Sequence, residues 1–510
     1  MTNNRKCGHG WLKLCLVLLP IFCHAGESVK PTPAHFRLSY ESLTLPHQEN
    51  MGLAGGTLLF NINDWLSIGP GTYGAITGHR GGFITLGMAA GVRRPLAEHL
   101  DIDGGVFVGA GGGDGGYTLV GGGLMVRTHL GAFITTKEWG NFGIGASNIS
   151  FPNGKITSTQ PYFAYEYPFE ILKLNGWVSP LLSSRQDLPP AESEFDIIYK
   201  TYFVSPNVTN LSGSSQFKTI DLMGAEWYHY INDHYFLKVE SEGAMGGHSN
   251  GYMQILIGGG YRQAITDSSF IKIAGQLGVA GGGGVATGGG LLLDASIGLQ
   301  QYLTHSLYVA LNGGYTDAPT GKFNASSASL QLGYGFDTPK VTTDCVSFSD
   351  LGGYKPQHLR VRTTNQTYFK GTSNWRHHHT NENVNLLGLQ LDYFIDKNYY
   401  LSGQGIGAYQ GNAGAYMTGL IGPGVYFSLG QSPFFFNAEG LIGAAGGGGL
   451  DVGGGFTWQT NAGIGYNLSN AFSLLGYYGY IQAPQGHLRA NVLGISLNYN
   501  FTLFSKKHRN

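Results

Sequence analysis

One short stretch of the sequence brings together side chains that can activate a nucleophile. GGHSNGY contains His248, Ser249 and Asn250, and a serine beside a histidine is the core of a hydrolytic site. Catalysis also requires the base to reach the nucleophile while a third group orients it, and neighbours in one loop rarely achieve this. The corresponding loops elsewhere in the chain do not repeat the arrangement. We therefore predict no catalytic residues and no enzymatic activity.

A second stretch has the composition of a metal site. Residues 375–383, WRHHHTNEN, hold the adjacent histidines His377–His379, and such runs can bind transition metals. Consecutive loop residues rarely all reach one ion, and no cysteine or carboxylate cluster supports them. We expect a solvated loop, no metal site and no cofactor. The many glycines also produce GxGxxG-like matches, but these do not open helices, so nucleotide binding is not supported.

Glycine is concentrated in three clusters, GAGGGDGGYTLVGGGL, AGGGGVATGGGLL and AAGGGGLDVGGGF, at residues 109–124, 280–292 and 444–456. Glycine permits positive φ and close backbone approach, so each cluster is predicted to form the tip of a hairpin. The preferred interpretation is a tight hairpin covered by neighbouring loops. The alternative is a bare backbone surface for an elongated ligand such as a glycan. Its candidate residues are Gly112, Gly113, Gly282, Gly283, Gly447 and Gly448.

The clusters belong to a longer unit that occurs three times. A Pro-X-Gly turn follows each cluster, and its prolines, Pro152, Pro319 and Pro484, are spaced by 167 and 165 residues. The aromatic pair that ends each unit shows the same two spacings. Two independent landmarks at one offset indicate three tandem copies of one structural unit.

Each copy contains about eight segments in which apolar and polar residues alternate, which is typical of half-buried strands. Short polar turns follow the even-numbered strands and longer loops follow the others. Several polar side chains interrupt the strands, and lipid exposure of a basic residue costs about 2–4 kcal/mol at mid-depth. We therefore expect them inside the barrels, in two ion-pair networks and at one further position. They are Arg37, Glu41 and Arg127; Lys200, Lys238, Glu240 and Asp294; and Gln459. Alternating glycines, such as Gly403 and Gly405, are expected to make room inside a crowded narrow barrel.

The composition favours a membrane protein built from strands. Only 12% of the residues are charged, 13% are aromatic and 83 of 510 are glycine. No run of about 18 apolar residues follows the N-terminal region, so a helical span is excluded. These features indicate an all-β, transmembrane antiparallel β-barrel. A soluble all-β protein is the remaining alternative.

The N-terminal residues have the pattern of a secretory signal peptide. Basic residues precede a short apolar core, and the small residues Cys23 and Ala25 stand before a cleavage point. Removing residues 1–25 leaves Cys345 as the remaining cysteine, so we expect no internal disulfide. It also leaves 27 basic against 31 acidic residues, and nothing in this balance suggests nucleic acid as a partner.

Together, the signal peptide, the alternation, the turn asymmetry and the terminal strands FAYEYPF, LQLGYGF and LNYNFTLF are similar to small eight-stranded outer-membrane barrels of the OmpA membrane-domain kind. The resemblance implies location in the outer membrane of a Gram-negative cell, contact with its lipid, and recognition by the barrel-assembly machinery. Phe501 or Phe504 would end the recognised strand. The tail SKKHRN departs from that pattern, because no aromatic residue is last.

The predicted organisation is a signal peptide (1–25), unit 1 (35–171), a linker (172–193), unit 2 (194–338), a linker (339–357), unit 3 (358–504) and a basic tail (505–510). Three separate barrels are preferred over one merged barrel of about 24 strands. We predict a structural, surface-binding or envelope-integrity role through the outer loops, with a surface glycan or envelope protein as partner. The alternatives are a transport pore for solutes or a glycan, if the units share one lumen, and a lipid-modifying hydrolase.

Overall fold

The structure is a computed structural model that describes residues 28–136, 139–180, 182, 188–341 and 345–507. The predicted signal peptide, residues 1–25, lies outside this part of the chain. Almost every described element is a β-strand. Three short helical turns complete the set: η1 (Pro46–Gln48), α1 (Gly116–Val120) and η2 (Phe348–Asp350).

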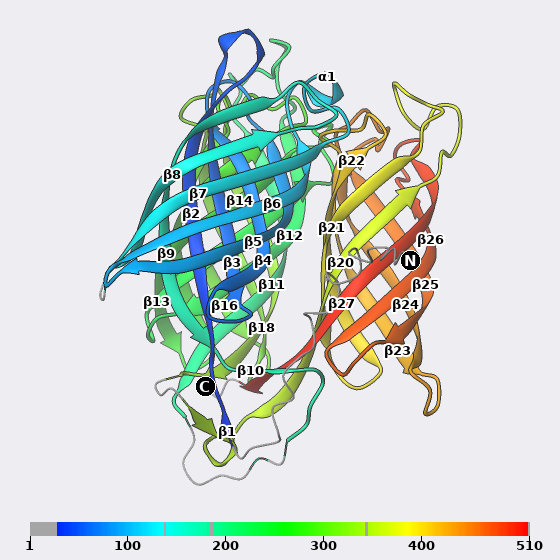
Figure 1. Ribbon diagram of the computed structural model, residues 1–510. Coiled ribbons are helices and arrows are strands. Elements are labelled where there is room, and N and C mark those ends of the chain that lie inside the picture. The colour runs from blue at the N-terminus through cyan, green and yellow to red at the C-terminus, as the bar shows by residue number, and fades with distance from the viewer. Residues whose placement is uncertain (1–27, 137–138, 181, 183–187, 342–344, 508–510) are drawn as a thin grey trace, which may run out of the picture.

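The strands form three antiparallel barrels, here called barrels 1, 2 and 3 (Figure 1). Barrel 1 consists of β2 (Thr32–Thr44), β3 (Asn50–Asn61), β4 (Leu66–Thr77), β5 (Ile84–Ala97), β6 (Leu100–Gly112), β7 (Leu124–Thr136), β8 (Gly140–Ser150) and β9 (Thr157–Ile171). Barrel 2 consists of β11 (Pro190–Val204), β12 (Thr219–Tyr230), β13 (Tyr235–Ala244), β14 (Met253–Thr266), β15 (Ser269–Gly281), β16 (Leu291–Tyr302), β17 (Leu307–Asp317) and β18 (Asn324–Pro339). Barrel 3 consists of β20 (Lys355–Tyr368), β21 (Val384–Phe394), β22 (Tyr399–Gln410), β23 (Met417–Ser428), β24 (Phe434–Gly446), β25 (Phe456–Asn467), β26 (Phe472–Gln482) and β27 (Arg489–Lys507).

Each barrel is closed by pairing between its own first and last strands. β2 pairs with β9, β11 with β18, and β20 with β27, all antiparallel. The all-β antiparallel barrel fold predicted from the sequence is therefore confirmed. The merged barrel of about 24 strands, considered as the alternative, is wrong. Eight strands are enough to close a barrel, and each copy uses its own first and last strands to do so. Barrels 2 and 3 are joined by strand pairing at one short place, where the ends of β18 and β27 pair at Phe336–Lys507 and Asp337–Lys506.

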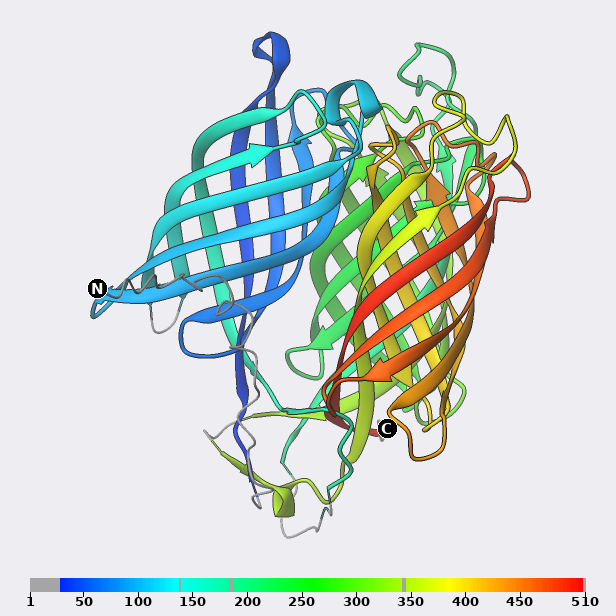
Figure 2. The ribbon, with the colours of Figure 1, turned by 45° about the vertical axis from the view of Figure 1, so that its right-hand side comes forward.

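The connections differ between the two ends of the barrels, as the sequence predicted. At one end, called the turn end, the connections are short, such as residues 267–268 between β14 and β15. At the other, called the loop end, they are longer, such as 205–218 between β11 and β12. The three barrels stand side by side with their loop ends in the same direction (Figures 1 and 2).

Apolar side chains cover the outside of the barrels. Exposed aliphatic residues occupy the middle of the strands, including Leu130, Ile144, Ile297, Leu311, Leu493 and Ile495. Exposed aromatic residues gather at or beside the short turns, namely Trp65, Trp139, Tyr235, Tyr399, Phe434 and Phe472. An aliphatic band bordered by aromatic side chains is the pattern expected of strands that cross a bilayer.

The alternating glycines of β22 point to the opposite side from the one we expected. Ser402 and Gln404 are buried, whereas Gly403 is exposed and lies on the outer face. A Cβ built on Gly405 would lie 3.3 Å from Leu86 of barrel 1. The prediction that these glycines relieve crowding inside the barrel is therefore wrong. Side chains on a strand alternate between two faces, but alternation alone does not say which face lines the lumen.

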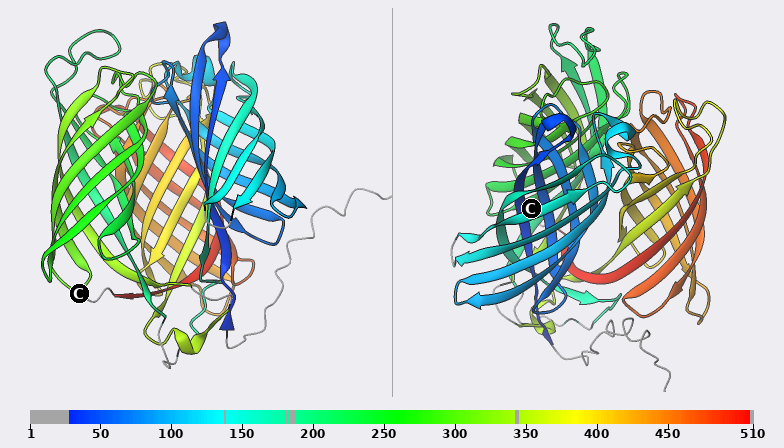
Figure 3. Two further views of the ribbon diagram at one scale, coloured as in Figure 1. Left: turned by 90° about the vertical axis from the view of Figure 1, so that its left-hand side faces the viewer. Right: turned by 45° about the horizontal axis from the view of Figure 1, so that its top comes forward.

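The segments between the barrels pack together at the turn end. β1 (Ser28–Val29) pairs with β19 (Val346–Ser347), and β10 (Lys173–Asn175) pairs with β27. Trp177, which follows barrel 1 in the chain, donates from Nε1 to the carbonyl of Leu359 in barrel 3 at 2.9 Å. The first linker thus crosses to barrel 3 before entering barrel 2, and it fixes the turn ends relative to one another (Figure 3).

Candidate functional site

The interior of barrel 1 is filled by a network of ion pairs. Arg37 Nε lies 2.7 Å from Glu166 Oε1, and its Nη2 lies 2.9 Å from Asp103 Oδ2. Arg127 Nε lies 2.7 Å from Glu41 Oε1. The structure therefore pairs Glu41 with Arg127, as expected, but brings Arg37 to other carboxylates. Arg37 and Glu41 are four residues apart along one strand, about 13 Å, whereas Arg37 lies directly opposite Glu166 in the β2–β9 register.

Most of the buried cations in barrel 2 are lysines, accompanied by Arg262, which pairs with Glu192. Lys200 contacts Glu240 and lies 2.9 Å from Glu242 Oε2, and Lys238 Nζ lies 2.9 Å from Glu240 Oε2. Asp294 accepts a hydrogen bond from Thr316 Oγ1 at 2.6 Å. All these groups are buried, in accordance with their predicted place in the lumen. Carboxyl groups outnumber lysines here: Glu194, Asp196, Glu226, Glu240, Glu242 and Asp294 are buried among Lys200, Lys238 and Lys272.

The buried charges inside barrel 3 are balanced, and its cations are arginines. Arg360 Nε lies 2.6 Å from Asp392 Oδ2, and Arg362 bridges Asp392 and Glu439. Both arginines are fully buried. The predicted interior residue Gln459 is buried too and donates to Asn461 Oδ1 at 3.0 Å. Sequence reasoning missed the two arginines as lumen groups, although they alternate with apolar residues in LRVRT.

These networks place buried side chains across each barrel interior. A cavity inside barrel 2, beside Lys200 and Asp294, has a volume of about 10 Å³, which is about the size needed for one water molecule. Buried charges in such a core pair with one another, as the contacts above show. The geometry is that of a packed core, whereas a solute pathway would require an open lumen.

The glycine clusters lie where the barrels meet. Gly123, Gly290 and Gly455 are the third glycines of the GGG triplets in the three clusters and have φ values of +101°, +98° and +105°. A Cβ on Gly123 would lie 2.2 Å from the carbonyl oxygen of Ala408 in barrel 3. The corresponding distances are 2.3 Å from Gly290 to Ala75 in barrel 1, and 2.2 Å from Gly455 to Ala244 in barrel 2. Each triplet therefore touches the preceding barrel, taken in cyclic order.

Backbone hydrogen bonds join the barrels at the same places. Gly81 N–H donates to the carbonyl of Gly288 at 2.9 Å, and Gly414 N–H donates to the carbonyl of Gly121 at 3.0 Å. Between barrels 2 and 3 the corresponding carbonyl, that of Gly453, accepts from the side-chain amide of Asn250. The three contacts, called the seams, run from barrel 1 to 2, from 2 to 3 and from 3 to 1. Such head-to-tail contacts close into a ring.

The seam glycines overlap only in part with those that we selected from the sequence as a ligand surface. Gly112 does lie at a seam, because a Cβ there would be 2.8 Å from the nitrogen of Ala415. Gly282 and Gly447 lie at seams too, since a Cβ on Gly82 of barrel 1 would be 2.3 Å from Gly282 N and a Cβ on Gly251 of barrel 2 would be 2.9 Å from Gly447 N. A Cβ on Gly113, Gly283 or Gly448 would meet backbone atoms of its own barrel. Ligand binding at these hairpin tips stays a prediction. The signal for the seams was present in the sequence, since Gly123, Gly290 and Gly455 repeat at spacings of 167 and 165 residues.

The remaining residues that the sequence suggested for catalysis or metal binding make structural contacts. His248 stacks on Phe217 with the ring centroids 4.5 Å apart, and buried Ser249 accepts from the Gln216 amide at 3.1 Å. His378 and His379 pack against the Tyr117 ring at centroid distances of 5.9 and 4.9 Å. Among the described residues, no group of three or more His, Cys, Asp or Glu could hold a metal ion. Cys345 is an exposed residue of the second linker.

A charged clamp holds the β4–β5 loop of barrel 1, which contacts barrel 2 at the first seam. Arg80 lies next to the seam residues Gly81 and Gly82, and its Nε and Nη2 donate to the two carboxylate oxygens of Glu49 at 2.8 and 2.6 Å. This hydrogen bonding lowers the pKa of Glu49 below its usual range. The clamp therefore orders one side of the seam while Glu49 is ionised.

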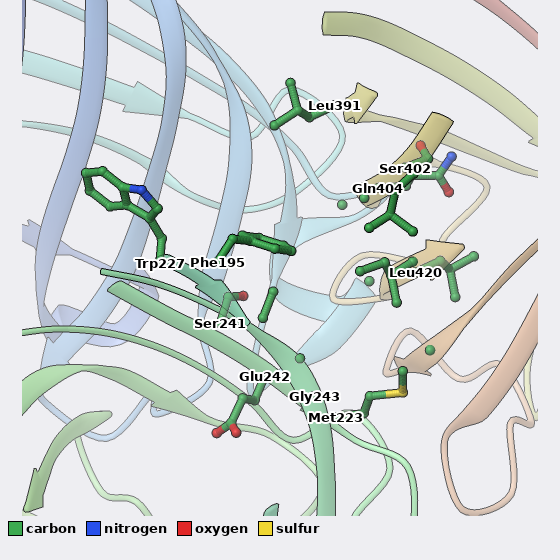
Figure 4. A pocket seen from close by; sticks show the side chains of 18 of the residues that line it. Phe195, Met223, Trp227, Ser241, Glu242, Gly243, Leu391, Ser402, Gln404 and Leu420 are labelled. Carbon is green, nitrogen blue, oxygen red and sulfur yellow. The ribbon is translucent and has the colours of Figure 1, made fainter. Parts of the chain in front are cut away.

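A large chamber lies between the barrels, outside all three lumens. It has a volume of about 1720 Å³ and is lined mainly by barrels 2 and 3. Figure 4 shows Phe195, Met223 and Trp227 of barrel 2 on one side and Leu391 of barrel 3 on the other. Barrel 1 contributes Gly82, Leu86 and Gly112, all near the loop end.

Comparisons with known proteins found matches among solved structures alone. No family model and no curated protein matches the sequence. Among solved structures, the chain is similar to the siderophore receptor PirA of Pseudomonas aeruginosa, at 10% identity over 92% of this chain and 80% of that chain, with a TM-score of 0.26. The outer membrane protein opdK of the same species matches at 10% identity over 92% and 99%, with a TM-score of 0.23. A de novo designed transmembrane β-barrel matches at 11% identity over 29% and 98%, with a TM-score of 0.20. At these scores the likenesses carry no argument about function. No helix in the described part of the chain is long and apolar enough to cross a membrane.

Proposed function

We propose that the chain is an outer-membrane protein with an envelope-supporting role, made of three non-conducting barrels locked into a ring. The observation that carries this proposal is the combination of a charged, packed interior with an apolar exterior in every barrel. Arg362, bridging Asp392 and Glu439 at the centre of barrel 3, represents the interiors. Exposed Leu493 and Ile495 on β27 of the same barrel represent the outside.

The location follows from the outer surface. An exposed aliphatic band bordered by aromatic residues is unfavourable in water and favourable in a bilayer. The barrel architecture and the predicted signal peptide select the outer membrane, where closed barrels of this kind are inserted after secretion. The barrel-assembly machinery and outer-membrane lipid are the partners that this proposal requires.

The role follows from the ring. Three filled barrels offer no shared lumen, which favours a structural role over the pore considered from the sequence. The seams instead hold three sets of loops on one side of the membrane in a fixed arrangement. Such a platform suits structural support or the binding of a surface glycan or envelope protein, and the loop end supplies its contact surface.

Conductance in a planar bilayer tests the proposal. The mature protein, shown by protease protection to be inserted, is expected to be electrically silent. A matched variant, Arg360→Ser/Arg362→Ser/Asp392→Ser/Glu439→Ser, removes two positive and two negative side chains from barrel 3 and is expected to produce channel steps. Large uniform steps from the unaltered protein would overturn the proposal and make the chain a pore.

A further inference from the structure

The chamber between the barrels has apolar walls. The outward-facing side chains of barrel 2 supply Phe195, Met223 and Trp227, and those of barrel 3 include Leu391 (Figure 4). Ile442 of barrel 3 also lines the chamber. Several of these side chains remain exposed within the chamber, Trp227 by 40% and Leu391 by 46%. The volume of about 1720 Å³ exceeds the roughly 300–1,000 Å³ of ordinary small-molecule sites. Apolar surface of this extent is stabilised by an apolar occupant.

The loop end of the chamber is closed. Ile84, Val279 and Met417, one from each barrel, pack into a buried cluster. The seams lie beside this cluster, and they bring Gly82 and Gly112 to the edge of the chamber. A molecule from the membrane leaflet on the loop side would have to pass both layers to enter.

The turn end is polar and basic. Lys355, at the start of β20, and Lys506, near the end of β27, both line the chamber, together with His305 and Gln357. Lys506 Nζ lies 4.8 Å above the ring of Tyr354. Lysine beside an aromatic ring at the end of an apolar band is the arrangement that meets lipid phosphate at a membrane surface.

We infer that the chamber binds a glycerophospholipid from the leaflet at the turn end, with its acyl chains against Phe195, Trp227 and Leu391 and its phosphate near Lys355 and Lys506. This inference rests on the proposed location in the outer membrane. Entry is from the side of barrel 1, which lines the chamber only near the loop end. The bound lipid then becomes part of the ring, filling the space that the seams enclose.

Two glycines allow the chamber to be filled without disturbing a barrel. A Cβ on Gly403 or Gly419 would meet no atom within 4 Å, and both residues line the chamber. The variant Gly403→Leu/Gly419→Leu should occupy the space of the acyl chains. Its matched control is Gly275→Leu/Gly476→Leu, two strand glycines with equally open surroundings on outer faces away from the chamber.

The test is lipid analysis of full-length protein purified in mild detergent and washed extensively, by native mass spectrometry and by extraction. We expect at least one glycerophospholipid per chain in the unaltered protein and in the control, and at least a tenfold loss in the chamber variant. Lys355→Gln/Lys506→Gln should reduce retention severalfold while the barrels stay folded. Retention of a lipopolysaccharide, or of no lipid, or equal retention in the chamber variant, would overturn the inference. Bilayer insertion and conductance of the same preparations test the proposed function separately, so an inserted, silent protein without lipid would refute this inference alone.

Discussion

The barrel interiors are packed by side chains that differ among the copies, whereas the seams are packed by backbone contacts that repeat. The three interiors differ in their residues: barrel 1 uses Arg37 and Arg127, barrel 2 uses Lys200 and Lys238, and barrel 3 uses a pair of arginines. The three seams repeat one backbone arrangement, with a Cβ-to-carbonyl approach of 2.2, 2.3 and 2.2 Å at equivalent glycines. A lumen can be filled by any set of side chains that satisfies charge and volume, whereas at a seam the glycine that faces an alanine carbonyl has no room for a Cβ. The comparison teaches that the ring is the feature common to the copies.

The largest effect is expected from breaking an interior ion pair. Arg362→Ala leaves the carboxylates of Asp392 and Glu439 buried without one cation, which should cost about 3–5 kcal/mol. Urea unfolding of the protein in detergent measures this loss. Removing the charge together with its partner, as Arg362→Met with Glu439→Gln, should restore most of the stability. An unchanged unfolding midpoint for Arg362→Ala would show that the core of barrel 3 is hydrated.

Breaking a seam should cost less free energy of unfolding than breaking an interior ion pair, but it should change the arrangement of the barrels more. Gly290→Ala places a Cβ 2.3 Å from the Ala75 carbonyl of barrel 1, at a residue with φ +98°. Gly284→Ala is the matched control, because its φ is +76° but nothing lies within 4 Å of the added Cβ. Both substitutions carry the strain of positive φ, about 1–3 kcal/mol.

Only Gly290→Ala should also expose the seam loops to protease while the barrels remain resistant to heat-induced unfolding on a gel. Equal protease patterns for the two variants would mean that the seam between barrels 1 and 2 does not depend on this close approach. The distinction between interior and seam would then be lost.

A third substitution sharpens the difference among interiors. Glu242 belongs to the carboxyl-rich core of barrel 2, and its Oε1 has no hydrogen-bond partner. Its Oε2 lies 2.9 Å from Lys200 Nζ, but Lys200 also contacts Glu240 and keeps that partner in Glu242→Gln. The substitution should therefore change the free energy of unfolding by less than about 1 kcal/mol. Glu439→Gln in the balanced core of barrel 3 should cost about 2 kcal/mol, because Glu439 accepts from Arg362, Tyr400 and Asn461. Similar costs for the two would show that the excess of carboxyl groups has no energetic consequence.

The smallest effect concerns pH and the clamp beside the first seam. The pKa of Glu49 is lowered in the folded protein by the hydrogen bond from Arg80. A lowered pKa stabilises the fold above the unfolded value of about 4.3, and this contribution is lost as the pH falls through the folded pKa. Hydrogen exchange in residues 78–83 should therefore accelerate at acidic pH. Glu49→Gln should exchange quickly at every pH, and a pH response that survives this substitution would assign the effect to another group.

Local patterns in the sequence predicted much of the fold. The alternation of polar and apolar residues predicted the strands, and the lengths of the connections distinguished the two ends of each barrel. The equal spacing of the three copies predicted Arg127, Asp294 and Gln459 as lumen residues. Ion-pair partners far apart in the sequence were harder to predict, because the neighbour of Arg37 is Glu166, which is 129 residues away. Contacts between copies were missed entirely. Glycines that alternate along a strand have no polar or apolar side chain to indicate whether they face the lumen or the outside. Gly403 and Gly405 were therefore assigned to the wrong side of their strand.

The ring also has a consequence for biogenesis. Its third seam joins Gly121, in the first barrel to leave the ribosome, to Gly414, in the last. Head-to-tail subunits made as separate chains could add without limit or stop at the wrong number. Tethering three copies in one polypeptide raises their effective concentration and sets the count at translation. A chain truncated after barrel 2 would leave two seam surfaces without barrel 3, and another protein could bind to either one.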